Sequence, residues 1–161
     1  MSNNLGTIPQ FGGTFCLSRA GLAIGDGAKT GTNSFAAPNG AGVDFSIDGI
    51  LYHKADAATV APFTAGTVQP VLTKCLYLVC IDSGGTITTV QGTPVLTADL
   101  VAGNAVLQWP KPSASVCVVG AVKITLASTA TFTPGTTALD ASNVTATYYN
   151  LSRVPAAPLT S

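Results

Sequence analysis

The sequence predicts an all-β protein, a small antiparallel β-sandwich or partly open barrel with extended N- and C-terminal arms. Strong helix formers are scarce, since the chain has no Glu and its one Met is Met1, whereas Thr and Val are abundant. Short apolar runs of strand length recur, and 17 Gly and 10 Pro separate them. About seven to nine short strands follow from this pattern.

The 161 residues divide into four segments around one domain. Residues 1–14 are polar and Gly-rich without periodicity, which predicts an extended N-terminal arm. Residues 15–42 should hold a strand or short helix over Phe15–Ile24 and then a long loop rich in Gly, Asn and Pro, of the kind that contacts a partner. We expect the β domain to cover residues 43–152 and a Pro-rich tail to cover residues 153–161.

The β domain opens with a hairpin signature. Apolar and polar residues alternate over Val43–Ile47, which is the period of a half-buried strand. Asp48-Gly49 follows, and then a second strand-like run, Ile50–Lys54. Because both positions of the tightest hairpin turn need positive φ, Asp-Gly between two such runs predicts a two-residue hairpin.

A second hairpin is predicted around the most apolar run, Val71–Ile81. This run is apolar at both odd and even positions, so we expect a central strand that is buried on both faces. Asp82–Gly85 then joins it to Thr86–Val90, which predicts two adjacent antiparallel strands.

The remaining elements are shorter or less regular. Thr97–Gly103 predicts a short helix capped by Thr97. Trp109–Pro112 cannot lie in a central strand, because its two prolines donate no ladder hydrogen bonds. Val116–Leu126 predicts a second buried strand, and Ala130–Thr133 and Asn143–Leu151 predict the last two strands.

The surface composition indicates association with partners. Only 9% of the residues are charged and the formal net charge is zero, whereas an average soluble domain has about 25% charged residues. A folded monomer of this mass exposes about 7,400 Å², which so few charges cannot cover. We therefore expect much of the surface to be buried against partners, and the alternative is a monomer coated with Thr and Ser.

The same composition argues against several function classes. The balanced charge gives no electrostatic footprint for nucleic acid or for an anionic membrane. No apolar run approaches the roughly 18 residues that span a bilayer, and the N-terminal residues lack a secretory signal pattern. The four cysteines form no metal-binding pair and only one His accompanies them, so we expect buried free thiols and synthesis in the cytosol.

Ser83 is the strongest catalytic candidate. It lies in CIDSGGT (Cys80–Thr86), which contains the Asp-Ser-Gly-Gly that surrounds the nucleophile of chymotrypsin-like serine proteases, and His53 lies upstream of it. The flanking residues do not fit, since Ile81 stands where a Gly usually precedes Asp-Ser and Thr86 where a Pro often follows. Because Asp, Ser and Gly are also turn residues, we expect a hairpin turn and no catalytic residue.

One segment of the chain is similar to phosphate-binding loops. Gly25–Thr30, GDGAKT, resembles two of them, but Ala28 stands where a P-loop has Gly before Lys-Thr, and Thr30 stands where a dinucleotide-binding loop has Gly. No convincing helix follows to hold a phosphate at its N-terminus, so no cofactor is expected.

Metal and nucleic-acid sites are not predicted either. A calcium loop needs acidic ligands at alternating positions of one segment, whereas the aspartates here stand singly. They are Asp26, Asp44, Asp48, Asp56, Asp82, Asp99 and Asp140. Phe11, Phe15, Tyr148 and Tyr149 lack the basic residues that a base-stacking groove requires, which favours packing in a core or interface.

Four stretches of the chain resemble one protein family. They are Ile47–Asp56, Cys75–Gly92, Cys117–Ile124 and Phe132–Ser152. In this order they resemble small structural proteins of tailed-bacteriophage virions, of the capsid decoration or cement type. The resemblance covers residues 43–155 and leaves the N-terminal arm and the long loop outside.

This resemblance implies a β-rich protein, usually trimeric, that sits outside the shell at three-fold and local three-fold positions and clamps neighbouring major capsid subunits after head expansion. It implies no catalytic residue, no metal and no cofactor. We therefore expect a homotrimer on the capsid exterior, made in the host cytoplasm. Two alternatives stay open: a head-fibre or tail module that binds a host receptor, and a small serine hydrolase that uses Ser83.

Overall fold

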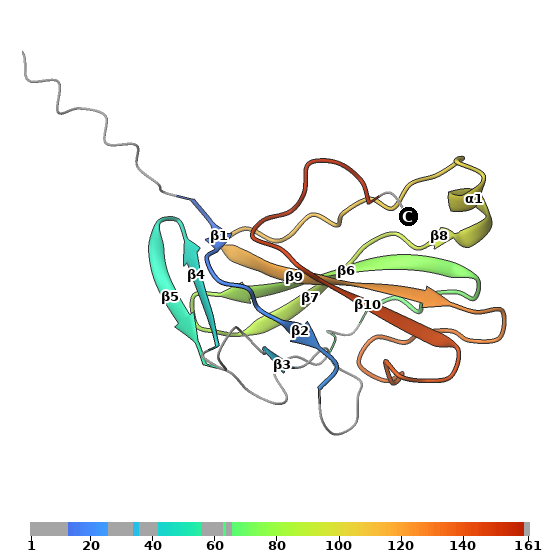
Figure 1. The fold of residues 1–161 in the computed structure, drawn as a ribbon, viewed down its shortest axis with the longest axis horizontal. Coiled ribbons are helices and arrows are strands. Elements are labelled where there is room, and N and C mark those ends of the chain that lie inside the picture. The colour runs from blue at the N-terminus through green and yellow to red at the C-terminus, as the bar shows by residue number, and fades with distance from the viewer. Residues whose placement is uncertain (1–12, 26–33, 36–41, 56–62, 64–65, 160–161) are drawn as a thin grey trace, which may run out of the picture.

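A computed structural model describes residues 13–25, 34–35, 42–55, 63 and 66–159 (Figure 1). The regular structure is almost entirely antiparallel β, arranged in two main sheets, as the sequence predicts. The two sheets pack together, with a hairpin at one end of the long axis of the molecule and one short helix at the other (Figure 1). No helix in these residues is long and apolar enough to cross a membrane.

The smaller sheet has the order β1-β4-β5. Its strands are β1 (Phe15–Cys16), β4 (Val43–Ile47) and β5 (Ile50–Lys54). Asp48 and Gly49 have φ of 50° and 84° and Ile47 lies opposite Ile50, which confirms the predicted two-residue hairpin. The chain then adds a separate strand pair, β2 (Leu22–Ala23) with β3 (Ser34–Phe35), so Phe15–Ile24 holds two short strands and no helix.

The larger sheet has the order β10-β9-β6-β7, and β8 also pairs with β6. Its strands are β6 (Thr73–Asp82), β7 (Ile87–Gln91), β8 (Val95–Leu96), β9 (Val116–Leu126) and β10 (Val144–Asn150). Strand β6 begins at Thr73 because Leu72, at φ 56°, ends a turn there. The predicted strand at Ala130–Thr133 is wrong: Phe132 makes only an isolated bridge to Gln69.

One core fills the space between the two sheets. It joins Phe45 and Ile47 of the smaller sheet to alternate residues of β6 and β9, including Tyr77 and Val119. The rings of Phe63, Tyr77 and Phe132 form a mutual edge-to-face cluster with centroids 4.9–5.8 Å apart. Edge-to-face contacts of this kind stabilise the fold beyond the contribution of the apolar area that the rings bury.

A second core lies on the opposite face of the larger sheet, under Leu78 and Cys80. Trp109 and Tyr149 cover it with their rings at 6.4 Å, and the Trp109 indole N–H donates to the carbonyl of Ala157 at 2.8 Å. The C-terminal segment therefore crosses back over the sheet. Strand β6 is buried on both faces, which confirms the predicted central strand.

Strand β9 contains a β-bulge. Val79 pairs with Gly120, whereas Cys80 pairs with Val118, so Val119 is the extra residue. The bulge shifts the alternation of side chains by one position. As a result both Val119 and Val122 reach the core between the sheets.

The single helix, α1 (Thr97–Val101), confirms the predicted helix but not its cap. Strand β8 continues to Leu96, which takes the N-cap position, so Thr97 lies inside the first turn and caps nothing. Its hydroxyl is buried, and no partner for it lies among the described residues.

Candidate functional site

Ser83 lies in the exposed turn between β6 and β7. Asp82 organises this turn, because its carboxylate accepts the Thr86 N–H at 2.8 Å and its carbonyl accepts the Gly85 N–H at 3.0 Å. Gly85 takes φ 79°, which L side chains rarely adopt. Ile81 pairs with residue 87 across the turn, so the predicted hairpin is confirmed.

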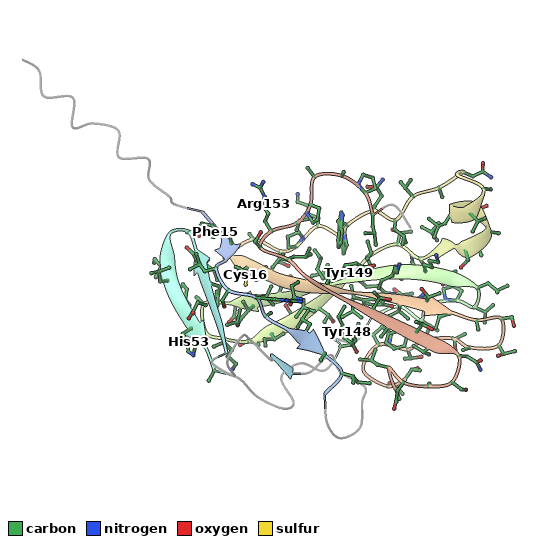
Figure 2. The ribbon with its side chains drawn as sticks, in the orientation of Figure 1. Phe15, Cys16, His53, Tyr148, Tyr149 and Arg153 are labelled. Atoms are coloured by element: carbon green, nitrogen blue, oxygen red, sulfur yellow. The ribbon has the colours of Figure 1, made fainter. Side chains whose placement is uncertain are left out.

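His53 is paired with Asp44 on the smaller sheet, with Nδ1 and Oδ1 2.7 Å apart and both side chains more than half exposed (Figure 2). Its neighbour Lys54 lies against Gly85 of the Ser83 turn. Successive strand residues point to opposite faces, so His53 points away from that turn. In the described structure no hydrogen bond joins Ser83 to His53, the two residues that the serine-protease alternative would bring together.

The residues that were considered for phosphate and metal binding are dispersed or lie outside the described residues. Residues 26–30 of the phosphate-loop candidate lie outside, as do Asp26 and Asp56. Asp48 and Asp82 lie in turns, Asp99 lies in the first turn of α1, and Asp44 pairs with the histidine. Among the described residues no three potential metal ligands come together.

The aromatic candidates face different ways. Tyr148 and Tyr149 are neighbours on β10, and they pack against the two cores on opposite faces of the larger sheet (Figure 2). Burial, assisted by the charge of Asp140, raises the pKa of Tyr148 to about 12. Phe15 is half-buried on β1, and Phe11 lies outside the described residues. The described rings, those of Phe15, Tyr148 and Tyr149, form no common stacking surface.

The four cysteines are free and buried, as predicted. Burial raises the pKa of Cys16 and Cys80 to about 11 and that of Cys75 and Cys117 to about 12. A thiol is a nucleophile or metal ligand only as thiolate. At neutral pH these four groups therefore act as small apolar side chains.

The hollows of the described surface are open and mixed in polarity. One, of about 560 Å³, lies between residues 66–70 and 91–94, where Gln91 exchanges two hydrogen bonds of 2.8 Å with the backbone of Thr67. A second, of about 300 Å³, lies beside Cys16 and Asn150. Neither holds a cluster of titratable groups.

Several exposed apolar side chains lie at the two ends of the molecule. At one end, Ile50 and Leu51 are 60% and 72% exposed at the β4–β5 hairpin, and we call these two residues the hairpin patch. At the other end, Leu72 and Leu96 are half exposed and Val101 of α1 is 81% exposed, and we call these three residues the helix patch. Leu72 also keeps a left-handed conformation, which is uncommon for a bulky residue.

Sequence reasoning anticipated an apolar surface but named neither patch. Two apolar residues directly after Asp48-Gly49 could have indicated the first one, because one of them must face away from the core in a strand. The second patch depends on which residues of α1 meet the sheet, and a five-residue helix has too little periodicity to show that.

No protein family, no characterised protein and no solved structure matches the chain. The function of the protein is therefore inferred from its fold and its surface.

Proposed function

We propose that this protein is a structural component of a tailed-bacteriophage virion that binds the capsid exterior as a homotrimer and stabilises the expanded head. One observation carries the proposal: a rigid β body with few charges exposes apolar side chains at both ends. Two separate apolar surfaces suit a protein that contacts more than one neighbour. The resemblance to decoration proteins supplies the type of assembly.

The energetics of such binding depend on repetition. Full burial of one exposed Leu or Ile contributes about 1.5–3 kcal/mol, so the hairpin patch alone supplies a few kcal/mol per copy. Ordering flexible residues on binding costs roughly 1–2 kcal/mol each. A single weak contact therefore becomes useful when several copies act together, as in a trimer on a repeating lattice.

The test has two steps, both with the full chain. Native mass spectrometry should give three times the chain mass of 16.1 kDa. The protein is then mixed with expanded phage capsids that lack decoration, pelleted, and quantified, with unexpanded capsids as the matched control. We expect saturable binding to expanded capsids and a higher temperature of capsid disruption.

Absence of binding by a folded protein to expanded capsids would contradict the proposal. Binding to host cells in place of capsids would favour the receptor-binding alternative. Replacing Val101 or Leu51 by Ser tests the two surfaces separately, because each substitution removes the most exposed apolar side chain of one patch and leaves the cores untouched.

A further inference from the structure

Strand β5 is an open edge of the smaller sheet. The sheet order β1-β4-β5 gives it a partner on one side only among the described strands. Ile47 and Ile50 flank the two-residue turn and form a hydrogen-bonded pair, and such pairs alternate along an antiparallel ladder. Leu51 and His53 therefore direct their backbone N–H and C=O groups outward, away from β4.

Within the described residues, strand β5 has no Pro and no bulge along this edge. Native proteins block exposed edges with Pro, bulges, or Lys side chains along the strand. The pairing of β4 with β5 is regular over all five residues, and Leu51 is 72% exposed. The one Lys of the strand, Lys54, lies against Gly85 of the other sheet and so leaves the edge free.

The residues that precede the described fold begin at the tip of the same hairpin. The Gly13 carbonyl accepts the Ser46 hydroxyl at 2.9 Å and the Gly49 N–H at 3.4 Å. The Asp48 N–H donates to the Thr14 hydroxyl at 3.1 Å. These bonds fix the chain on the β1 side of the tip, about three strand spacings or ~14 Å from the position of a strand added beyond β5.

The composition of residues 1–12 suits this edge. They have no charged side chain and include Leu5, Ile8 and Phe11, which could cover the hairpin patch. Twelve residues in extended form span about 40 Å, which is enough to reach an adjacent copy. To pair with its own β5 the segment would have to fold back around the hairpin tip, whereas the edge of a neighbour needs no such reversal.

We propose that residues 1–12 of one copy add a strand to the open edge of β5 in a neighbouring copy, bonding the outward backbone groups of Leu51 and His53 and covering the hairpin patch. Strand addition of this kind takes its affinity from main-chain hydrogen bonds and its specificity from side-chain contacts. The inference rests on the proposed function in one respect: it names the contact that joins the copies.

The experiment places a photoreactive benzoyl-phenylalanine at position 51 of the full chain, in an equal mixture of ¹⁴N- and ¹⁵N-labelled protein. The same amino acid at position 101, in the helix patch, is the matched control. We expect crosslinks from position 51 to residues 1–12, half of them in peptides of mixed label, and none to residues 1–12 from position 101. If every crosslinked peptide carried either ¹⁴N alone or ¹⁵N alone, the segment would pair with its own copy, and the inference would be overturned.

Two variants test the hydrogen bonds. Leu51→Pro removes an outward N–H and leaves the β4 ladder intact, whereas Leu51→Thr keeps that N–H. We expect Leu51→Pro and deletion of residues 1–12 each to reduce the native mass to that of the variant's monomer, which is 16.1 kDa for the full-length chain. Leu51→Thr should keep the oligomer. An unchanged mass after the deletion refutes the inference, even if Leu51→Pro fails to fold.

The outcomes separate this inference from the proposed function. Capsid binding without the crosslink would leave the capsid role standing and remove the strand exchange. The crosslink in a protein that binds no capsid would support the strand exchange and contradict the capsid role.

Discussion

Gly120→Ala is expected to destabilise the fold strongly, because the glycine lies where β9 meets both β10 and the side chain of Leu22. A Cβ at this position would stand 2.2 Å from Leu22 Cδ1 and 2.6 Å from the carbonyl oxygen of Tyr149. Unstrained contacts between carbon atoms are about 3.5–4.0 Å. The Leu22 side chain can rotate, but the Tyr149 carbonyl belongs to the backbone of a paired strand and cannot move independently.

The expected magnitude follows from these two contacts. Overpacking of a well-packed core costs typically about 1–3 kcal/mol, and a backbone obstacle places Gly120→Ala at the upper end. The lower entropy of the unfolded Ala chain offsets only about 0.4–1 kcal/mol. A net loss of about 2 kcal/mol lowers Tm by about 4–8 °C for a domain of this size.

Thermal and urea unfolding followed by circular dichroism measure the loss. Gly84→Ala is the matched control, because the nearest obstacle there is the Asp82 carboxylate at 3.3 Å on an exposed turn. In the double variant Leu22→Ala/Gly120→Ala one of the two clashes is absent, so the combined loss should be smaller than the sum of the single losses. A Gly120→Ala protein with unchanged Tm would refute the close approach of β9 and Leu22.

Three further outcomes follow from the buried groups and the Ser83 turn. Tyr77→Phe should lower the free energy of unfolding, measured in urea, by about 1–3 kcal/mol. The Tyr77 hydroxyl donates to Gln69 Oε1 and accepts from Gln91 Nε2, both at 3.2 Å, and its loss leaves the buried Gln69 Oε1 without this donor. Tm should fall as pH rises from 9 toward 11. The thiols of the unfolded chain have a pKa near 9, whereas burial raises the pKa of the folded Cys16 and Cys80 to about 11, so ionisation favours the unfolded state over this range. A Tm that rises between pH 9 and 11 would contradict the burial of these thiols. Asp82→Ala should cost about 1 kcal/mol, because it removes the carboxylate that accepts the Thr86 N–H. Ser83→Ala should change Tm little and alter no ester or peptide hydrolysis. Hydrolysis abolished by Ser83→Ala would contradict the proposed function.

The hairpins were predictable because their determinants are local. Asp48-Gly49 and the Asp82–Gly85 turn each use residues that favour the required backbone angles, and apolar strands flank them. Strand β6 was predictable as central because its apolar residues occupy both faces. These features depend on a few neighbouring residues, and the sequence carries that information directly.

Other features depend on residues far apart in the chain. Gln69 is fully buried because its amide donates to the carbonyls of Thr73 and Ile124 at 3.2 Å, and the latter lies on another strand. Trp109 is half-buried because the C-terminal segment crosses over it to reach Ala157. His53 and Asp44 meet only through strand register. No local pattern indicates such contacts, and the same holds for the two exposed patches.

The β-bulge at Val119 bears on how β9 tolerates sequence change. In most strands the alternation of polar and apolar residues fixes the register, since a shift by one residue would bury the polar face. Strand β9 is apolar on both faces along much of its length, so that constraint is weak there. What remains is shape: only a residue without a side chain fits beneath Leu22. Exchange of one apolar residue of β9 for another therefore need not shift the register, because Gly120 fixes the strand against Leu22 and β10.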